Sequence, residues 1–256
     1  MNATPAFVPG PDAPLRDQLA AMLVVRIGSN MAPFPTVEDD ASRVQALLAE
    51  LLGVDVFCFG SNLRESTRTE VEEERRDPER LTQRREAWIR LVQRLRGAYT
   101  GPLTYAARFP GEAQEIAFFE QLDFIGLLFY PSLTRTEAVP DDGELHRSLR
   151  FQLQQALDFA VRWNRPLLLA QVGFPGRADS WGRAFVPRGA LDLGAQERYL
   201  SALADVLATK LDGLDSLRGF FLWNWPLDEA VGGPEDAGFS LRAKPVESAL
   251  RRLFAR

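Results

Sequence analysis

The stretch VDVFCFGSNL at residues 54–63 contains the pattern that decides the fold. Its first six residues are almost continuously apolar, and Gly60, Ser61 and Asn62 follow directly. A strand that is apolar on both faces is typical of a parallel sheet covered by helices on both sides. We therefore expect a buried parallel strand here, with Asn62 just beyond its carboxyl end.

Five further apolar runs of the same kind occupy residues 22–27, 103–107, 124–130, 167–174 and 219–225. Between them, apolar residues recur at helical spacing. This periodicity predicts helices over residues 37–52, 65–97, 149–163, 196–211 and 248–254, with an interruption at Pro78. Alternating strands and helices predict right-handed βαβ units and the α/β class. No glycine-rich nucleotide loop follows any strand, so the pattern favours a TIM-type (β/α) barrel.

The number of strands departs from a complete barrel, which has eight strand–helix units where this sequence predicts about six. We expect a barrel domain over residues 21–256, with its first two units missing or irregular, after an irregular segment over residues 1–20. Either the barrel is incomplete on its N-terminal side, or residues 1–20 cover the gap. Open sheet edges are an association hazard, so we expect a second copy or another partner to cover the edge.

Composition excludes several classes of function. The 256 residues carry a net charge of -5, with 30 basic and 35 acidic residues well mixed. This balance offers no nucleic-acid footprint and no polybasic membrane patch. The single Cys58 excludes an internal disulfide, and the single His146 has no second histidine with which to share a metal. We expect Cys58 in the core, His146 at the surface, and neither a cofactor nor a metal.

Targeting signals are not visible in the sequence. Residues 1–17 lack the basic and then apolar regions of a secretory signal, and no run approaches the roughly 18 apolar residues of a membrane helix. We expect a soluble, cytoplasmic protein.

Five stretches together resemble one enzyme family, in the family's order. They are residues 54–63 quoted above, GPLTYAA at 101–107, FFEQLDFIG at 118–126, RPLLLAQVGFP at 165–175 and GFSLRAKP at 238–245. The family is glycoside hydrolase family 113, the β-mannanase-like barrels, and the resemblance runs from about residue 54 to residue 256. It implies that residues 22–27 are the third barrel strand and that the first two family strands are absent.

The resemblance also implies a site with altered chemistry. A retaining glycosidase places two carboxylates roughly 5–5.5 Å apart across the scissile bond. By position, Asn62 takes the place of the acid/base and Gln171 that of the nucleophile. An amide has neither an acidic proton nor an anionic oxygen, and loss of acid–base assistance alone removes about 10²–10⁴-fold in rate. We therefore identify no catalytic residue with certainty.

Aromatic residues lie where ligands of a barrel bind, at the carboxyl ends of the predicted strands. The predicted ligand-binding residues are Asn62, Tyr130, Gln171, Phe174, Trp223 and Trp225. Aromatic faces stack on sugar rings, although a core position is equally consistent for Trp225.

Two functions remain open. The favoured hypothesis is a glycosidase-like barrel without hydrolytic activity, which binds an oligo- or polysaccharide or serves as a scaffold. The alternative is an active, mannanase-like glycoside hydrolase that uses other carboxylates. The candidates near strand ends are Glu65, Asp228 and Glu229.

Overall fold

The computed structural model describes residues 22–24, 39–67, 78–134, 138–211, 216–226, 228, 231–248 and 250. The predicted irregular segment over residues 1–20 lies outside these residues, as does most of the closing helix predicted over residues 248–254. Both therefore remain predictions.

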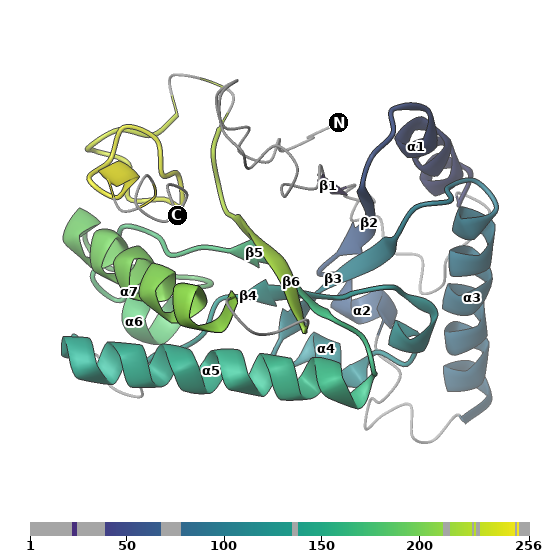
Figure 1. The fold of residues 1–256 in the computed structure, drawn as a ribbon, viewed down its shortest axis with the longest axis horizontal. Helices are drawn as coiled ribbons and strands as arrows, with labels where there is room; N and C mark the ends of the chain where they lie inside the picture. The colour runs from purple at the N-terminus through teal and green to yellow at the C-terminus, as the bar shows by residue number, and fades with distance from the viewer. Residues whose placement is uncertain are drawn as a thin grey trace. The chain divides into compact units, whose positions relative to one another are not determined.

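All six predicted strands are present. Their bounds are β1 Met22–Val24, β2 Val56–Ser61, β3 Leu103–Phe109, β4 Ile125–Phe129, β5 Leu167–Val172 and β6 Leu217–Leu222. They follow one another in the sheet in chain order, and β1 pairs with β2, and β2 with β3, in parallel (Figure 1). The prediction of an α/β, TIM-type barrel with about six regular units is confirmed. The described part of the chain holds six strands where a complete barrel has eight.

Helices alternate with these strands. Their bounds are α1 Asp39–Leu51, α2 Arg64–Thr67, α3 Pro78–Arg96, α4 Glu112–Glu115, α5 Asp142–Arg162, α6 Ser180–Arg183 and α7 Leu193–Leu211. Pro78 begins α3, a position where its missing N–H is not needed. The periodicity did not predict the four-residue helices α4 and α6, which are too short to show a stripe.

The chain forms two compact units, of which the first comprises Met1–Leu128 and Trp163–Leu168. An aromatic cluster occupies its core: Trp88 stacks on Phe118 at 5.0 Å between ring centroids, and Phe59 and Tyr105 pack against Phe118. Cys58 is fully buried, and burial raises the pKa of its thiol to about 12. The prediction that Cys58 lies in the core is therefore confirmed.

Helix α1 of the first unit turns its large apolar side chains to solvent. Its stripe, which would normally be the core face of an amphipathic helix, is 43–82% exposed and consists of Val44, Leu47, Leu48, Leu51 and the following Leu52. Small residues, Ser42, Ala46 and Ala49, are buried instead, where α1 contacts α3 and β2. The core face of α1 is therefore formed by its small side chains.

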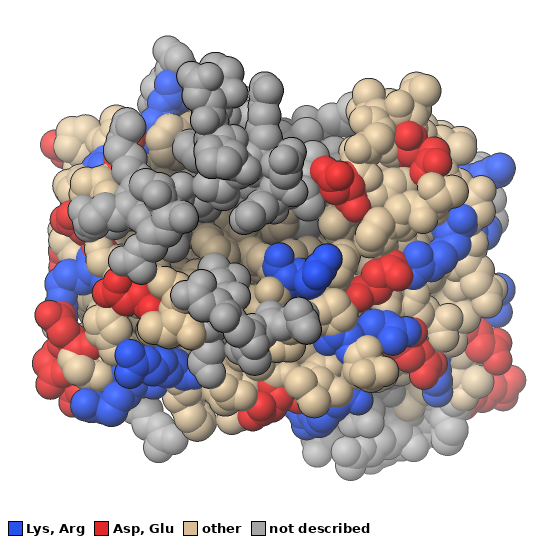
Figure 2. Space-filling model, in the orientation of Figure 1, with Lys and Arg blue, Asp and Glu red and all other residues tan. Residues whose placement is uncertain are grey.

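The second unit comprises Phe129–Arg162 and Leu169–Arg256. Here α5 and α7 lie side by side (Figure 1). His146 lies on α5, partly exposed, with its imidazole beside the carboxylate of Asp205 on α7 at 3.5 Å. Over the face drawn in Figure 2, the described basic and acidic residues are interspersed without a large field of one sign.

Candidate functional site

Asn62 stands at the carboxyl end of β2, beyond an irregularity in the strand. Cys58 pairs with Thr104 and Ser61 with Ala106, so β2 has one extra residue between these pairs. Such a bulge bends a strand and re-aims the side chains that follow. Asn62 then adopts a φ of 53°, in the left-handed region where asparagine is among the few common non-glycine residues. Its N–H donates to the carbonyl oxygen of Ala106 at 3.0 Å, and the residue is exposed.

Tyr105 of β3 packs directly over this bulge. A Cβ at Gly60 would lie 2.9 Å from Cε2 of the Tyr105 ring, so only glycine fits beneath it. The Tyr105 hydroxyl accepts a hydrogen bond from the N–H of Leu63 at 2.7 Å and donates one to Glu112 at 2.5 Å. Burial and the neighbouring Glu112 raise the pKa of Tyr105 well above its ordinary value, so the phenol stays protonated and can donate.

Glu112, on α4, is a fully buried carboxylate behind the end of β2. Its Oε1 also accepts a hydrogen bond from the Thr67 hydroxyl at 2.9 Å, and its Oε2 accepts one from the N–H of Arg108 at 3.0 Å. Burial raises the pKa of Glu112 above its ordinary value, although these hydrogen bonds oppose the shift. Sequence reasoning missed both Glu112 and Tyr105, because their pairing depends on α4 returning against β3.

Gln171 is the penultimate residue of β5 in the second unit, and its side chain contacts Tyr130. The Tyr130 hydroxyl donates to Oε1 of Gln171 at 3.1 Å, and no acceptor for the amide nitrogen of Gln171 occurs among the described residues. Burial raises the pKa of Tyr130 far above its ordinary value, so this hydroxyl stays protonated. The Tyr130 ring contacts Phe185 and Phe239 edge-on, with centroids 5.3 and 5.6 Å away. The structure thus brings two predicted site residues, Tyr130 and Gln171, into direct contact.

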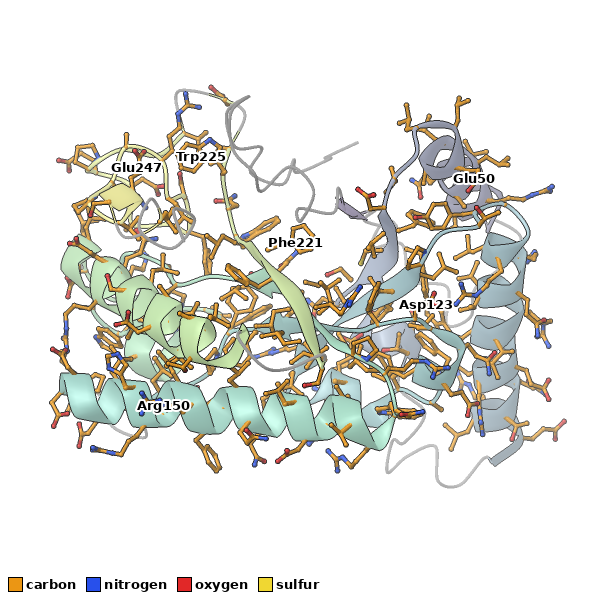
Figure 3. The ribbon with its side chains drawn as sticks, in the orientation of Figure 1. Glu50, Asp123, Arg150, Phe221, Trp225 and Glu247 are labelled. Atoms are coloured by element: carbon orange, nitrogen blue, oxygen red, sulfur yellow. The ribbon has the colours of Figure 1, made fainter. Side chains whose placement is uncertain are left out.

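Trp223 lies beside the same strand end. Its N–H donates to the carbonyl oxygen of Val172 at 2.7 Å, and its own carbonyl oxygen would be 2.7 Å from a Cβ on Gly173. Gly173 therefore permits the close approach of the chain after β6. Trp225 follows on the stretch between β6 and the closing segment that carries Glu247, as Figure 3 shows, and both tryptophans are partly exposed.

A buried lysine supports the segment that carries Phe239. The ammonium of Lys244 lies 3.3 Å from the carboxylate of Asp236 and donates to the carbonyl oxygen of Gly238 at 3.1 Å. Burial lowers the pKa of Lys244, and Asp236 opposes that shift. This pair fixes the chain just before Phe239 and hence the aromatic wall around Tyr130.

Phe174 occupies a different environment from the one predicted. It is 0% exposed, stacks on Tyr199 at 4.3 Å between centroids and packs on Trp181 at 4.9 Å. In this structure Phe174 is a core residue of the second unit and presents no surface to a ligand. The apolar residues around it explain why the chain turns inward directly after Gln171 and Gly173.

The alternative carboxylates fall partly outside the described residues. Asp228 is exposed on the stretch after β6, and its carbonyl oxygen accepts a hydrogen bond from the N–H of Val231 at 3.1 Å. The side chains of Glu65 and Glu229 lie outside the part of the chain that the structure describes. Asn62 belongs to the first unit, and Gln171, Tyr130, Trp223 and Trp225 belong to the second.

The described residues hold neither a cluster of metal ligands nor a membrane-spanning helix. Among them, no group of three or more His, Cys, Asp or Glu side chains is placed to hold a metal ion. No helix in the described ranges is long and apolar enough to cross a membrane.

Comparison with known proteins identifies the relatives of this chain. The family model of Glycoside Hydrolase Family 113 matches residues 39–244. No curated protein matches the sequence. A GH113 β-mannanase from Alicyclobacillus acidocaldarius, solved in complex with ManMIm, is 22% identical with a TM-score of 0.63; the match covers 85% of this chain and 60% of that one.

Two further solved structures have a similar fold. A GH113 β-1,4-mannanase is 19% identical with a TM-score of 0.63, over 90% of this chain and 67% of that one. A Bifidobacterium dentium β-glucuronidase is 13% identical with a TM-score of 0.56, over 85% of this chain and 33% of that one. The chain thus spans about 60–67% of the length of the two mannanases.

Proposed function

Because the chain belongs to glycoside hydrolase family 113, we propose that it is a mannanase-like barrel protein that binds saccharides and does not hydrolyse them. The observation that carries the proposal is the pair of amides, Asn62 and Gln171, at the positions that the family resemblance gives to the acid/base and the nucleophile. Hydrolysis with retention needs one carboxyl group that protonates the leaving oxygen and one that attacks. Neither amide can do this near neutral pH.

The geometry around Gln171 supports binding in place of catalysis. Tyr130 donates to the amide oxygen, and no described residue accepts from the amide nitrogen, which can therefore donate to an acceptor such as a sugar hydroxyl oxygen. A carboxylate at this position would accept hydrogen bonds only. The partly exposed Trp223 and Trp225 add aromatic faces suited to the apolar faces of a sugar ring.

Isothermal titration calorimetry with manno-oligosaccharides tests the proposal. We expect measurable binding by the wild type and a loss of at least about fivefold in affinity for Trp225→Ala, the size of one good aromatic contact. Phe151→Ala is the matched control, because Phe151 is 60% exposed on α5 and is not a predicted site residue. No heat for the wild type, with no effect of Trp225→Ala, would favour a scaffold.

The rival function is an active mannanase-like hydrolase that uses displaced carboxylates. Among the described residues Asp228 is exposed on the stretch after β6, whereas Glu112 is buried and already accepts three hydrogen bonds. We expect no release of reducing ends from manno-oligosaccharides and no cleavage of aryl β-mannosides. Turnover that disappears in Asp228→Ala or Glu65→Ala would overturn the non-hydrolytic proposal.

A further proposal concerns the partner. Helix α1 contacts β2 in a sheet whose strand order starts at β1, and the exposed face of the helix carries large apolar side chains. We infer that a second copy of the chain covers this exposed face, because an isologous contact buries the same apolar patch on both copies.

A further inference from the structure

Glu112 is a buried carboxylate behind the end of β2, the strand that Asn62 follows. Glu112 is 0% exposed, and no ion pair to it occurs among the described residues. A buried carboxylate is costly unless hydrogen bonds compensate its lost hydration. The segments that these hydrogen bonds connect therefore indicate what Glu112 holds in place.

The hydrogen bonds join three segments of the first unit. Oε1 of Glu112 accepts from Tyr105 of β3 and from Thr67 of α2, and Oε2 accepts from the N–H of Arg108. Tyr105 in turn accepts a hydrogen bond from the N–H of Leu63. The chain of contacts therefore runs from α4 through one hydroxyl to the peptide group directly after Asn62.

Both peptide groups that flank Asn62 are bound to β3. The N–H of Asn62 donates to the carbonyl oxygen of Ala106, and the N–H of Leu63 donates to the Tyr105 hydroxyl. Asn62 itself has a φ of 53°, a conformation that L-residues adopt at a cost. Such a conformation persists where surrounding contacts determine it.

We propose that Glu112 is a positioning residue, which acts through Tyr105 to hold the left-handed turn that presents the Asn62 side chain. The role in ligand binding rests on the proposed function, whereas the effect on the turn does not. Glu112 orients the Tyr105 hydroxyl by accepting its hydrogen bond, so that the lone pairs of the hydroxyl face the N–H of Leu63. Without that acceptor the hydroxyl is free to rotate, and the turn loses one of its two fixed peptide groups.

The test combines amide hydrogen exchange of the ligand-free protein with saccharide titration at pH 7.5. Glu112→Leu keeps a side chain of similar size but has no acceptor oxygen, so the Arg108 N–H and both hydroxyls lose their acceptor. Tyr105→Phe removes the hydroxyl itself. We expect both variants to speed exchange of the Leu63 amide about tenfold, the effect of roughly 1.4 kcal/mol of local opening, and to weaken saccharide affinity several-fold.

Glu115→Gln is the matched control, since Glu115 lies on the same helix and forms a partly exposed ion pair with Arg64. We expect it to change exchange and affinity by less than about twofold. The amide of Ile125, which donates to the carbonyl oxygen of Pro166, reports global opening of the same unit. If exchange at Leu63 and Ile125 rises equally, or Leu63 is unaffected, Glu112 is only a structural residue and the inference is overturned.

Failure of the proposed function gives a different result. Selective acceleration at Leu63 in a protein that binds no saccharide would support the positioning of the turn and reject saccharide binding. If Glu112→Leu does not fold, Thr67→Val removes one hydroxyl donor to Glu112 and leaves the Tyr105 contact in place. This variant should leave exchange at Leu63 within about threefold of the wild type, and a larger selective increase would contradict the route through Tyr105.

Discussion

At the scale of the residue, Asn62 is suited to its backbone as well as to its place in the site. Its φ of 53° falls in the left-handed region, which asparagine tolerates better than glutamate because its short side chain bonds locally to the backbone. Position 62 therefore favours an amide for a conformational reason, independently of any ligand. Gln171 has no such requirement, since it belongs to the regular strand β5.

The variants Asn62→Glu and Gln171→Glu, singly and combined, compare the conformational requirements at these two positions. We expect glutamate at position 62 to lower the free energy of unfolding by about 1 kcal/mol, the cost of a longer side chain in the left-handed region, and glutamate at 171 to have a smaller effect. Chemical denaturation of both single variants measures this, with Asn62→Gly as the unstrained control. The double variant should also show weak cleavage of aryl β-mannosides; a folded protein without any turnover would mean that restoring the two carboxyl groups does not restore catalysis.

Glu112 predicts a dependence of stability on pH. Burial raises its pKa in the folded protein above the ordinary value of 4.5, so the folded state holds its proton more tightly than the unfolded state does. The resulting stabilisation is complete below pH 4.5 and is lost as the pH rises through the higher folded-state pKa. We therefore expect the stability of the wild type relative to Glu112→Gln, which cannot ionise, to fall between pH 4.5 and 7.5. A difference in unfolding free energy that is constant over this range would contradict the raised pKa.

At the scale of the element, the strands and most helix faces were predictable, and the exposed apolar face of α1 was not. Continuous apolar runs identify β2 and β5 because both faces of these strands are buried, and their burial patterns agree. Periodicity located α1 but suggested that its large apolar residues face the core. In the structure its small residues do so, because small side chains allow the closest approach to a neighbouring helix. The Glu112 network was unpredictable because a four-residue helix leaves no periodic signal.

Paired substitutions on α1 check its orientation. Leu47→Glu with Leu51→Glu should change the free energy of unfolding by less than about 0.5 kcal/mol for the isolated chain, because both side chains are exposed. Ala46→Leu should instead cost about 1–3 kcal/mol, because it overpacks the buried face. Urea denaturation at low protein concentration compares the two, and the reverse ranking would show that the leucines face the core.

At the scale of the whole molecule, the family and the class of fold were predictable from the sequence. The distribution of the predicted site residues over the molecule was not. The amides lie in separate compact units, Asn62 in the first and Gln171 in the second. The chain also spans only about 60–67% of the mannanases it resembles. The ends of strands can be predicted from local composition. The contacts that support these strand ends depend on segments that are distant in sequence.

We expect the chain to associate with a second copy through the apolar face of α1. Sedimentation equilibrium should show a weight-average mass that rises with the concentration of the wild-type protein, and a lower mass for Leu47→Glu with Leu51→Glu, because charges on the contact oppose burial. Val139→Glu is the control, since Val139 is an exposed apolar residue elsewhere, in the second unit. A monomeric wild type at every concentration would remove the second copy as the partner.

The glycine beneath Tyr105 also bears on how the sheet finds its alignment during folding. If β2 slipped by one residue against β3, Phe59 or Ser61 would come to lie under the tyrosine ring, where a Cβ at Gly60 would already lie only 2.9 Å from it. A slip of one residue also exchanges the two faces of a strand. Gly60 and Tyr105 therefore penalise misaligned pairings at the moment these strands meet, so that correct alignment of the two strands is built in before any ligand is present.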